Sequence, residues 1–144
     1  MALALAAARA AGEVGDVPVG AVLLGPDGRL LAVAGNRVER RRDPTAHAEL
    51  LVLRAGGRRL GTPRLVGCDL WVTLEPCPMC AHAIALARIR RLYFGAFDPK
   101  GGGVEHGPRI FAHATARHRP EVYGGLGERA AAELLRRFFA ARRS

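Results

Sequence analysis

Apolar and turn-forming residues succeed one another at the start of this chain in a pattern that predicts a helix and then two strands. Residues 2–11 are almost all Ala and Leu, which favour a short helix, and Gly12 follows them. Two apolar stretches, 17–24 and 29–35, flank the turn-forming sequence Gly-Pro-Asp-Gly. We therefore expect a first helix followed by a β-hairpin.

The next segment predicts one helix between two connections. A polar loop at 36–45 ends at Thr45, which suits the cap of a helix over the apolar run 46–53. Gly and Pro residues then predict a connection at 55–63. His47 falls in the first turn of this predicted helix.

A strand and a helix follow in the same way, and the pattern continues to the end of the chain. Residues 69–74 predict a strand that Glu75-Pro76 ends, and Pro76 and Pro78 suit the entry of a helix that continues over 80–88. The other predicted elements are strands at 91–95 and 122–123, a glycine-rich loop at 98–107 that is too polar to bury, a brief helix at 110–111 and a last helix at 128–141. Strands that alternate with helices predict an α/β fold, with parallel pairing where a helix crosses between strands.

Composition agrees with one domain that spans residues 1–144. The chain has 144 residues, of which 49% are hydrophobic, so a single core can be buried. No apolar run approaches the roughly 18 residues of a membrane-spanning helix. The first ten residues lack a preceding basic segment and contain Arg9, so they predict a helix of the domain, not a signal peptide.

The three cysteines favour metal binding in a reduced compartment, and so the cytoplasm. Cys68, Cys77 and Cys80 are odd in number, and the last two form a C-x-x-C pair. A redox pair is the alternative, but it leaves His47 and Glu49 without a role.

The charge of the chain indicates a polyanionic partner. Basic residues number 22 and acidic residues 13, which gives a net charge of +9 and favours nucleic acid. The alternative is compositional, since all the basic residues but Lys100 are arginine, as a GC-biased coding sequence would produce.

Two short clusters carry the candidate chemistry: His47-Ala48-Glu49 and Pro76-Cys77-Pro78-Met79-Cys80. The histidine and the two cysteines supply three zinc ligands, and three ligands leave the open position that distinguishes a catalytic zinc site from a structural one. Zinc lowers the pKa of bound water toward ~7, so a zinc-bound hydroxide becomes available as nucleophile. Glu49 remains free to move protons as general acid and base.

A structural zinc site with Cys68 as fourth ligand is the alternative. Cys68 precedes the predicted strand 69–74, whereas Cys77 follows it. A strand rises ~3.3 Å per residue, so its length keeps Cys68 away from the metal. Cys68 is instead expected to be a small buried residue.

H-x-E combined with P-C-x-x-C is the signature of zinc-dependent nucleobase deaminases. Residues 17–22, 35–37, 43–49 and 74–80, together with Phe138-Phe139 and Arg142-Arg143, resemble the bacterial tRNA-specific adenosine deaminase family. The resemblance implies conversion of adenosine to inosine at the wobble position of a tRNA anticodon, one zinc ion per subunit and a homodimer. It also implies a cytidine-deaminase-like three-layer α/β/α sandwich with a central mixed sheet of about five strands.

The resemblance also implies roles for particular residues. The expected zinc ligands are His47, Cys77 and Cys80, and the expected proton shuttle is Glu49. Groups that hydrogen-bond the flipped base are expected at the Asn36 side chain and the Ala48 backbone, and the wall against which it packs at Val17, Pro18 and Val19. Contacts with the anticodon stem-loop are expected from Asp98, Lys100, Arg119, Phe139, Arg142 and Arg143.

Several of these residues have a structural alternative. Asn36 can close the hairpin as a turn residue, Phe139 can belong to the core, and Arg142 and Arg143 can form a solvated helix end. The first helix is shorter than in the family and the 101–107 loop differs from it, and both border the substrate entrance there.

Two other functions remain as alternatives to the deamination of adenosine in tRNA. One is deamination of a free base or nucleoside such as guanine, cytosine or cytidine, which uses the same zinc and Glu49. The other is a catalytically silent zinc module that binds RNA or a partner subunit and has no need of Glu49.

Overall fold

A computed structural model describes residues 1–143 and confirms the α/β fold. Five strands form one sheet: β1 (Gly20–Leu24), β2 (Leu30–Gly35), β3 (Asp69–Leu74), β4 (Arg91–Ala96) and β5 (Glu121–Gly124). The helices are α1 (Ala2–Glu13), α2 (Val38–Arg41), α3 (Ala48–Leu60), α4 (Pro78–Leu86) and α5 (Glu128–Arg143), with a 3₁₀ turn η1 (Ile110–Ala112). None of the helices in this described part is long and apolar enough to cross a membrane.

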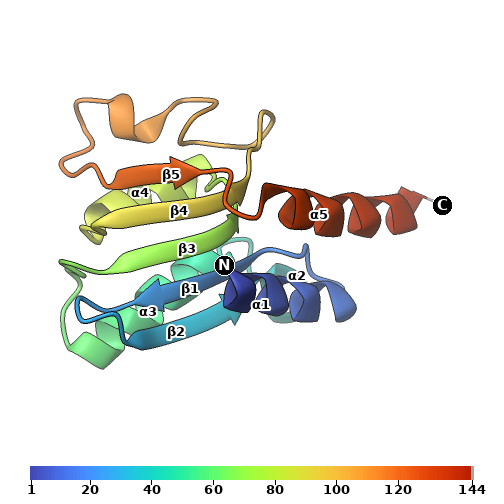
Figure 1. Ribbon diagram of the computed structural model, residues 1–144, viewed down its shortest axis with the longest axis horizontal. Coiled ribbons are helices and arrows are strands. Elements are labelled where there is room, and N and C mark those ends of the chain that lie inside the picture. Colours follow the sequence, from blue (N-terminus) through green and yellow to red (C-terminus); the bar gives the residue numbers. More distant parts are fainter. Residues whose placement is uncertain (144) are drawn as a thin grey trace.

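The strand order determines which chain ends meet. The order is β2-β1-β3-β4-β5, as Figure 1 shows, and β1 runs antiparallel to both of its neighbours. The strands β3, β4 and β5 are parallel. Since β2 and β3 both oppose β1, β2 runs in the same direction as β3, β4 and β5. The carboxyl ends of these strands therefore meet at one edge of the sheet, where ligands usually bind in α/β proteins.

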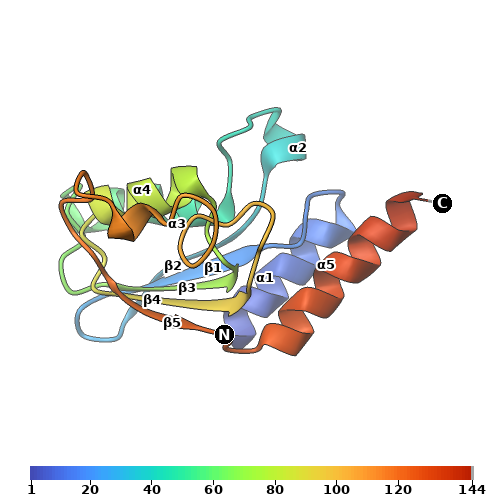
Figure 2. The same ribbon diagram turned by 90° about the horizontal axis from the view of Figure 1, so that it is seen from above.

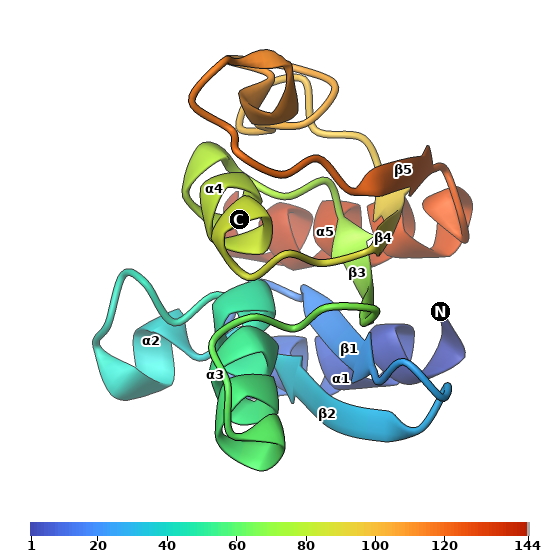
Figure 3. The same ribbon diagram turned by 90° about the vertical axis from the view of Figure 1, so that its left-hand side faces the viewer.

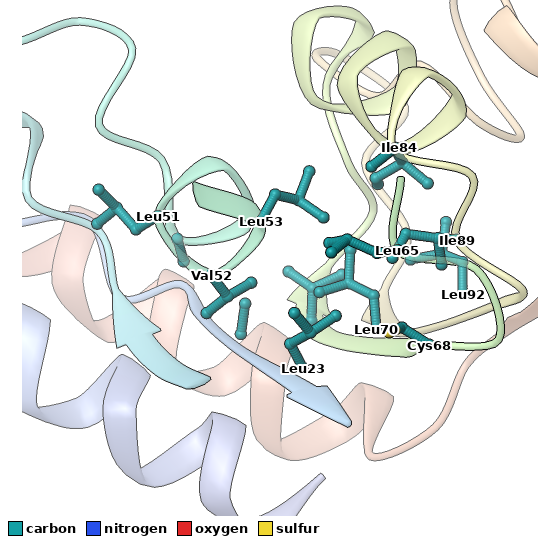
Figure 4. Packing of buried hydrophobic residues seen from close by; sticks show 14 of the residues in the cluster. Leu23, Leu51, Val52, Leu53, Leu65, Cys68, Leu70, Ile84, Ile89 and Leu92 are labelled. Carbon is teal, nitrogen blue, oxygen red and sulfur yellow. The ribbon is translucent and has the colours of Figure 1, made fainter. Parts of the chain in front are cut away.

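Helices cover both faces of the sheet, which gives the three layers. Figure 2 shows α3 and α4 on one face and α1 and α5 side by side on the other. The core between the sheet and the α3–α4 layer is built from alternating strand residues: Leu23, Leu70 and Leu92 are in register across three strands and none of them is exposed. Figure 4 shows these residues with those that pack on them from the helices and loops, namely Leu51, Val52, Leu53, Leu65, Cys68, Ile84 and Ile89.

The alanine-rich first helix lies unusually close to the hairpin. A Cβ atom at Gly20 would overlap the Ala4 carbonyl oxygen, and one at Gly35 would lie 2.6 Å from the Ala7 carbonyl oxygen. Small residues on the helix and glycine on the strands thus allow direct packing of backbone on backbone. The helix extends to Glu13, two residues beyond the predicted end.

Helix α3 differs from its prediction at both ends. It begins at Ala48, and the residue at its N-cap is His47, while the Thr45 hydroxyl bonds the Asp43 carboxylate and caps nothing. It also continues through Gly56 to Leu60, so the predicted connection at 55–63 is wrong for most of its length. Gly56 is kept in the helix because it faces β1, where a Cβ atom would overlap the Leu23 side chain.

The glycine-rich loop 98–107 is also not the wholly exposed segment that was predicted. Gly102, Gly103 and Val104 are buried. Their burial depends on Glu75, a fully enclosed carboxylate that accepts hydrogen bonds from the loop.

Candidate metal centre and active site

The two motif segments meet at the carboxyl edge of the sheet because each follows a strand that ends there. His47 is the N-cap of α3 and Cys77 is the N-cap of α4, both with extended backbone. Cys80 lies in the first turn of α4. Two helix amino ends, with their unpaired N–H groups, are thus directed at one point, and this arrangement favours negatively charged sulfur.

The donor atoms of His47, Cys77 and Cys80 lie within 4.8 Å of one another, and they form the one group of this kind in residues 1–143. His47 Nδ1 lies 3.7 Å from Cys77 Sγ and 3.6 Å from Cys80 Sγ. One imidazole nitrogen and two sulfurs are a donor set that zinc prefers. These residues therefore fit a zinc ion, with no fourth side chain in the group.

Electrostatics in the site agree with metal binding. The pKa of the Cys77 thiol is lowered to about 4, chiefly by the hydrogen bond with Cys80 and also by that with His47. The Cys80 thiol is hydrogen-bonded to Cys77 and buried, and both effects raise its pKa. Zinc binds cysteine sulfur as thiolate, so its binding displaces the proton that the pair retains.

Cys68 is remote from this group. It is fully buried in the core and directly precedes β3, at the end opposite to Cys77. All three cysteines are free. The structure thus gives Cys68 the packing role that was expected of it.

Glu49 is the carboxylate beside the metal donors. It occupies the second position of α3 and is only 4% exposed. Burial raises its pKa to about 7, because the charged form is poorly solvated there. A carboxyl group with such a pKa can accept and return a proton near neutral pH.

A cavity of about 340 Å³ opens onto these groups. The predicted site residues that line it are Val17, Val19, Asn36, His47, Glu49, Cys77 and Asp98. It is also lined by residues that the motifs do not mark, namely Asp16, Val38, Glu39, Leu74, Glu75 and Gly101.

A hydrogen bond joins Asn36 to Ala48. Asn36 is 8% exposed, and its Oδ1 accepts a hydrogen bond of 2.8 Å from the Ala48 N–H. This bond assigns the amide orientation and leaves the Nδ2 group of Asn36 as a donor beside the cavity. Asn36 thus ties the hairpin to the start of α3 and also faces the site.

Asp16 also lines the cavity. It is completely buried, its Oδ1 accepts the Glu39 N–H at 2.8 Å, and its Oδ2 lies 3.3 Å from Arg40 Nε. These bonds hold α2 beside the cavity. No local sequence signal marks this residue, since its partners lie 23 and 24 positions further along the chain.

The other predicted contact residues lie outside the cavity lining. Pro18 lines a second hollow between α1 and α5, and Lys100 is exposed on the 98–107 loop. Arg119 is exposed just before β5, at the amino edge of the sheet and away from the cavity. Phe139, Arg142 and Arg143 are exposed in the last turns of α5, so Phe139 is not a core residue.

The end of α5 and the short helix α2 both project past the sheet on the side where β3 and β4 end (Figure 2). The Arg142 guanidinium lies 3.5 Å from the centre of the Phe138 ring. Arginines are thus present on two projections near the edge that holds the cavity.

Proteins that keep an unligated glutamate beside a zinc ion, and draw the zinc ligands from H-x-E and P-C-x-x-C segments, are nucleobase deaminases. The fold and the site place the chain in that class. Comparison with known proteins agrees, because the family model described as "Cytidine and deoxycytidylate deaminase zinc-binding region" matches residues 1–96.

Relatives narrow the assignment. The chain is 57% identical over 143 residues to the tRNA-specific adenosine deaminase of Agrobacterium fabrum, covering 99% of this chain and 93% of the relative. It is 43% identical over 136 residues to that of Bacillus subtilis, covering 94% and 84%. The chain therefore belongs to the family of tRNA-specific adenosine deaminases.

The comparison with solved structures agrees with this assignment. A structure from a study of A-to-I editing by tRNA:A34 deaminases superimposes with a TM-score of 0.92 at 58% identity, covering 94% of this chain and 97% of the other. A guanine deaminase from Nitrosomonas europaea gives a TM-score of 0.82 at 28% identity, covering 96% and 82%. The resemblance read from the sequence is confirmed.

Proposed function

We propose that this protein hydrolyses adenosine to inosine at the wobble position of a tRNA anticodon, with Glu49 as the proton shuttle. The observation that carries the chemistry is the buried Glu49 carboxylate. It is not one of the three metal donors, but it lines the cavity beside them. The substrate follows from the family, whose members named above share more than 40% of their residues with this chain.

The chain's own groups divide the reaction between them. Zinc, when bound by His47, Cys77 and Cys80, supplies a Lewis acid that lowers the pKa of water. Glu49 takes the proton of the attacking water as C6 of the base is attacked, and returns it to the amino group that leaves as ammonia. Burial raises the pKa of Glu49 toward the range in which a carboxyl group both accepts and returns a proton at neutral pH.

The base is held by groups at the cavity wall. The Nδ2 group of Asn36 is a donor for a ring nitrogen of the base, because Oδ1 is already engaged by the Ala48 N–H. Val17 and Val19 offer apolar surface for packing against the base.

Charge supports an RNA substrate over a free base. The net charge of +9 gives an electrostatic attraction that a free nucleobase does not need. Arg142, Arg143 and the exposed Phe139 on the projecting end of α5 are suited to phosphate and base contacts, and Lys100 and Asp98 to contacts at the cavity rim. Arg119 is far from this edge, so its proposed contact needs the RNA to reach around the sheet.

The assembly completes the proposal. One sheet with one core supports a single deaminase domain over 1–144, and one donor group supports one zinc ion per subunit. The three free cysteines suit a cytoplasmic location. The helices α3 and α4 lie side by side (Figure 3). The open hollow of about 670 Å³ between them is lined mainly by apolar side chains, among them Leu50, Leu53 and Leu86, together with Arg54 and Arg58. Leu86 is 61% exposed, and we assign this surface to a second copy of the chain.

The test of the substrate incubates the purified protein with an adenosine-containing anticodon stem-loop, with adenosine, with guanine and with cytosine in parallel. Inosine in the stem-loop, lost steeply as salt rises, is the expected result. Ammonia released from a free base, with turnover indifferent to salt, would refute the tRNA substrate and support the alternative deaminase. Glu49→Ala is the matched control: a deaminase loses turnover and keeps zinc, whereas a silent binding module loses nothing.

The test of the dimer is the molar mass in solution at several concentrations. Leu86→Arg places a charge in the apolar hollow and is expected to give a monomer. Val66→Arg is the control, since Val66 is 68% exposed and lies outside the hollow. A monomeric wild type would refute the dimer without affecting the proposed reaction.

A further inference from the structure

Glu75 is a buried carboxylate with no part in the chemistry described above. It is 1% exposed and directly precedes the Pro76-Cys77 turn. Its Oε1 accepts hydrogen bonds from the Asp98 N–H at 3.0 Å and from His106 Nδ1 at 2.8 Å. Its Oε2 accepts three more, from the N–H groups of Val104, Glu105 and His106 at 3.2, 2.9 and 3.1 Å.

All five donors belong to one segment, residues 98–106, which follows β4 in the chain. Three successive N–H groups around a single oxygen form the anion-binding concavity known from backbone nests. The segment thus closes on Glu75 at both ends, first at Asp98 and finally at His106. A buried charge with this many donors is a fixed point around which the loop is folded.

The close packing of the segment also explains its glycines. A Cβ atom at Gly102 would overlap the Glu75 carboxylate oxygen, and one at Gly103 would lie 2.6 Å from the Pro78 nitrogen. The Gly103 N–H donates to the Pro76 carbonyl at 2.8 Å. The loop therefore packs directly on the turn that carries Cys77.

The same segment forms part of the cavity rim. Asp98 and Gly101 line the cavity, as does Glu75 itself. The Asp98 carboxylate accepts the N–H groups of Lys100 and Gly101 at 3.2 and 2.9 Å, so the rim turn is closed on itself. Its position relative to the site then depends on the bonds to Glu75.

His106 contributes the one side-chain donor among the five. Its side chain is 35% exposed, and its ring lies edge-on to Phe97, with the ring centres 6.2 Å apart. Since a carboxylate only accepts, Nδ1 must carry the hydrogen. His106 thus fastens the far end of the segment and can be changed without removing the buried charge.

We propose that Glu75 and His106 are positioning residues that hold the 98–107 rim in the shape that admits the target nucleotide. The inference deepens the proposed function and rests on it for the identity of the substrate. The rim acts on binding and leaves the proton transfer at Glu49 unchanged. Weakening the bonds that hold this rim therefore raises KM and leaves kcat and the zinc content nearly as they are.

The test compares His106→Ala with His106→Asn, whose side-chain amide can return a donor toward Glu75. His82→Ala is the control, since His82 is an exposed histidine on α4 outside the cavity. For His106→Ala we expect KM for the stem-loop to rise about tenfold, with kcat within about twofold. His106→Asn is expected to restore most of the affinity, and His82→Ala to match the wild type.

Hydrogen exchange gives a readout that needs no substrate. In His106→Ala the amides of Val104 and Glu105 are expected to exchange faster, while those of α4 keep their protection. An unchanged KM, a fall in kcat with KM unaltered, or no recovery in His106→Asn would each overturn the proposal. If the wild type acts on a free base and not on RNA, the proposed function fails, and the same KM comparison with that base still decides the role of the rim.

Discussion

Asn36 offers the sharpest separation of a structural from a functional role. Its Oδ1 accepts the buried Ala48 N–H at the start of α3, and its Nδ2 faces the cavity. Asn36→Asp keeps an acceptor for Ala48 at a helix amino end, where negative charge is favourable, and removes the donor to the base. Asn36→Ala removes both groups.

The expected magnitudes follow from these bonds. Leaving the Ala48 N–H buried without a partner costs about 1–3 kcal/mol, so Asn36→Ala is expected to lose that much free energy of unfolding. Asn36→Asp is expected to stay within about 1 kcal/mol of the wild type. If the donor contributes about 1–3 kcal/mol to binding the base in the transition state, both variants lose roughly 5- to 150-fold in kcat/KM.

Urea unfolding measures the first quantity and inosine formation in the stem-loop measures the second, with the zinc content of each variant determined in parallel. A structural residue that only closes the hairpin would show loss of stability in Asn36→Ala and full kcat/KM in Asn36→Asp. That result would refute the assignment of Nδ2 to the base.

Three further predictions address the core, the metal donors and the RNA path. Gly56→Ala is expected to lower the free energy of unfolding by about 1–3 kcal/mol in urea because its Cβ would overlap Leu23, whereas Gly57→Ala, with 3.4 Å to its nearest neighbour, is expected to be neutral or up to about 1 kcal/mol stabilising. Cys77→Ser is expected to lose bound zinc and all turnover by metal analysis and assay, while Cys68→Ala keeps both; zinc retained in Cys77→Ser would contradict the donor set. Arg143→Ala is expected to reduce the slope of log affinity against log salt by about one unit, and the exposed Arg64, in the loop before β3, serves as the control whose removal leaves the slope unchanged.

Local patterns predicted much of the fold. The hairpin, the strand β3 and the entry of α4 at Pro78 were found from alternation and from the conformational limits of Gly and Pro. The boundaries of α3 were not. Its start depends on the bond between Asn36 and Ala48, and its course through Gly56 depends on packing against Leu23, which are contacts between distant parts of the chain.

The site divides in the same way. The metal donors and Glu49 were predicted because few residue types can do their chemistry, and because their spacing is local. Asp16 and Glu75 act through bonds to backbone groups 23 to 31 positions away, and no spacing rule marks such partners. The loop 98–107 was misjudged for the same reason, since a polar sequence can be buried when a carboxylate from elsewhere satisfies its N–H groups.

The placement of the donors makes zinc uptake a measure of folding. His47 precedes α3 and the two cysteines begin α4, so neither helix brings a complete set, and the donors meet only after β3 has paired with β1. In an unfolded chain the histidine is not held near the two cysteines. Zinc therefore binds the assembled sheet in preference, and free zinc at a thousand times its dissociation constant would stabilise the fold by about 4 kcal/mol. In a cell, the supply of the metal would then influence how much of this protein survives, apart from any effect on the reaction.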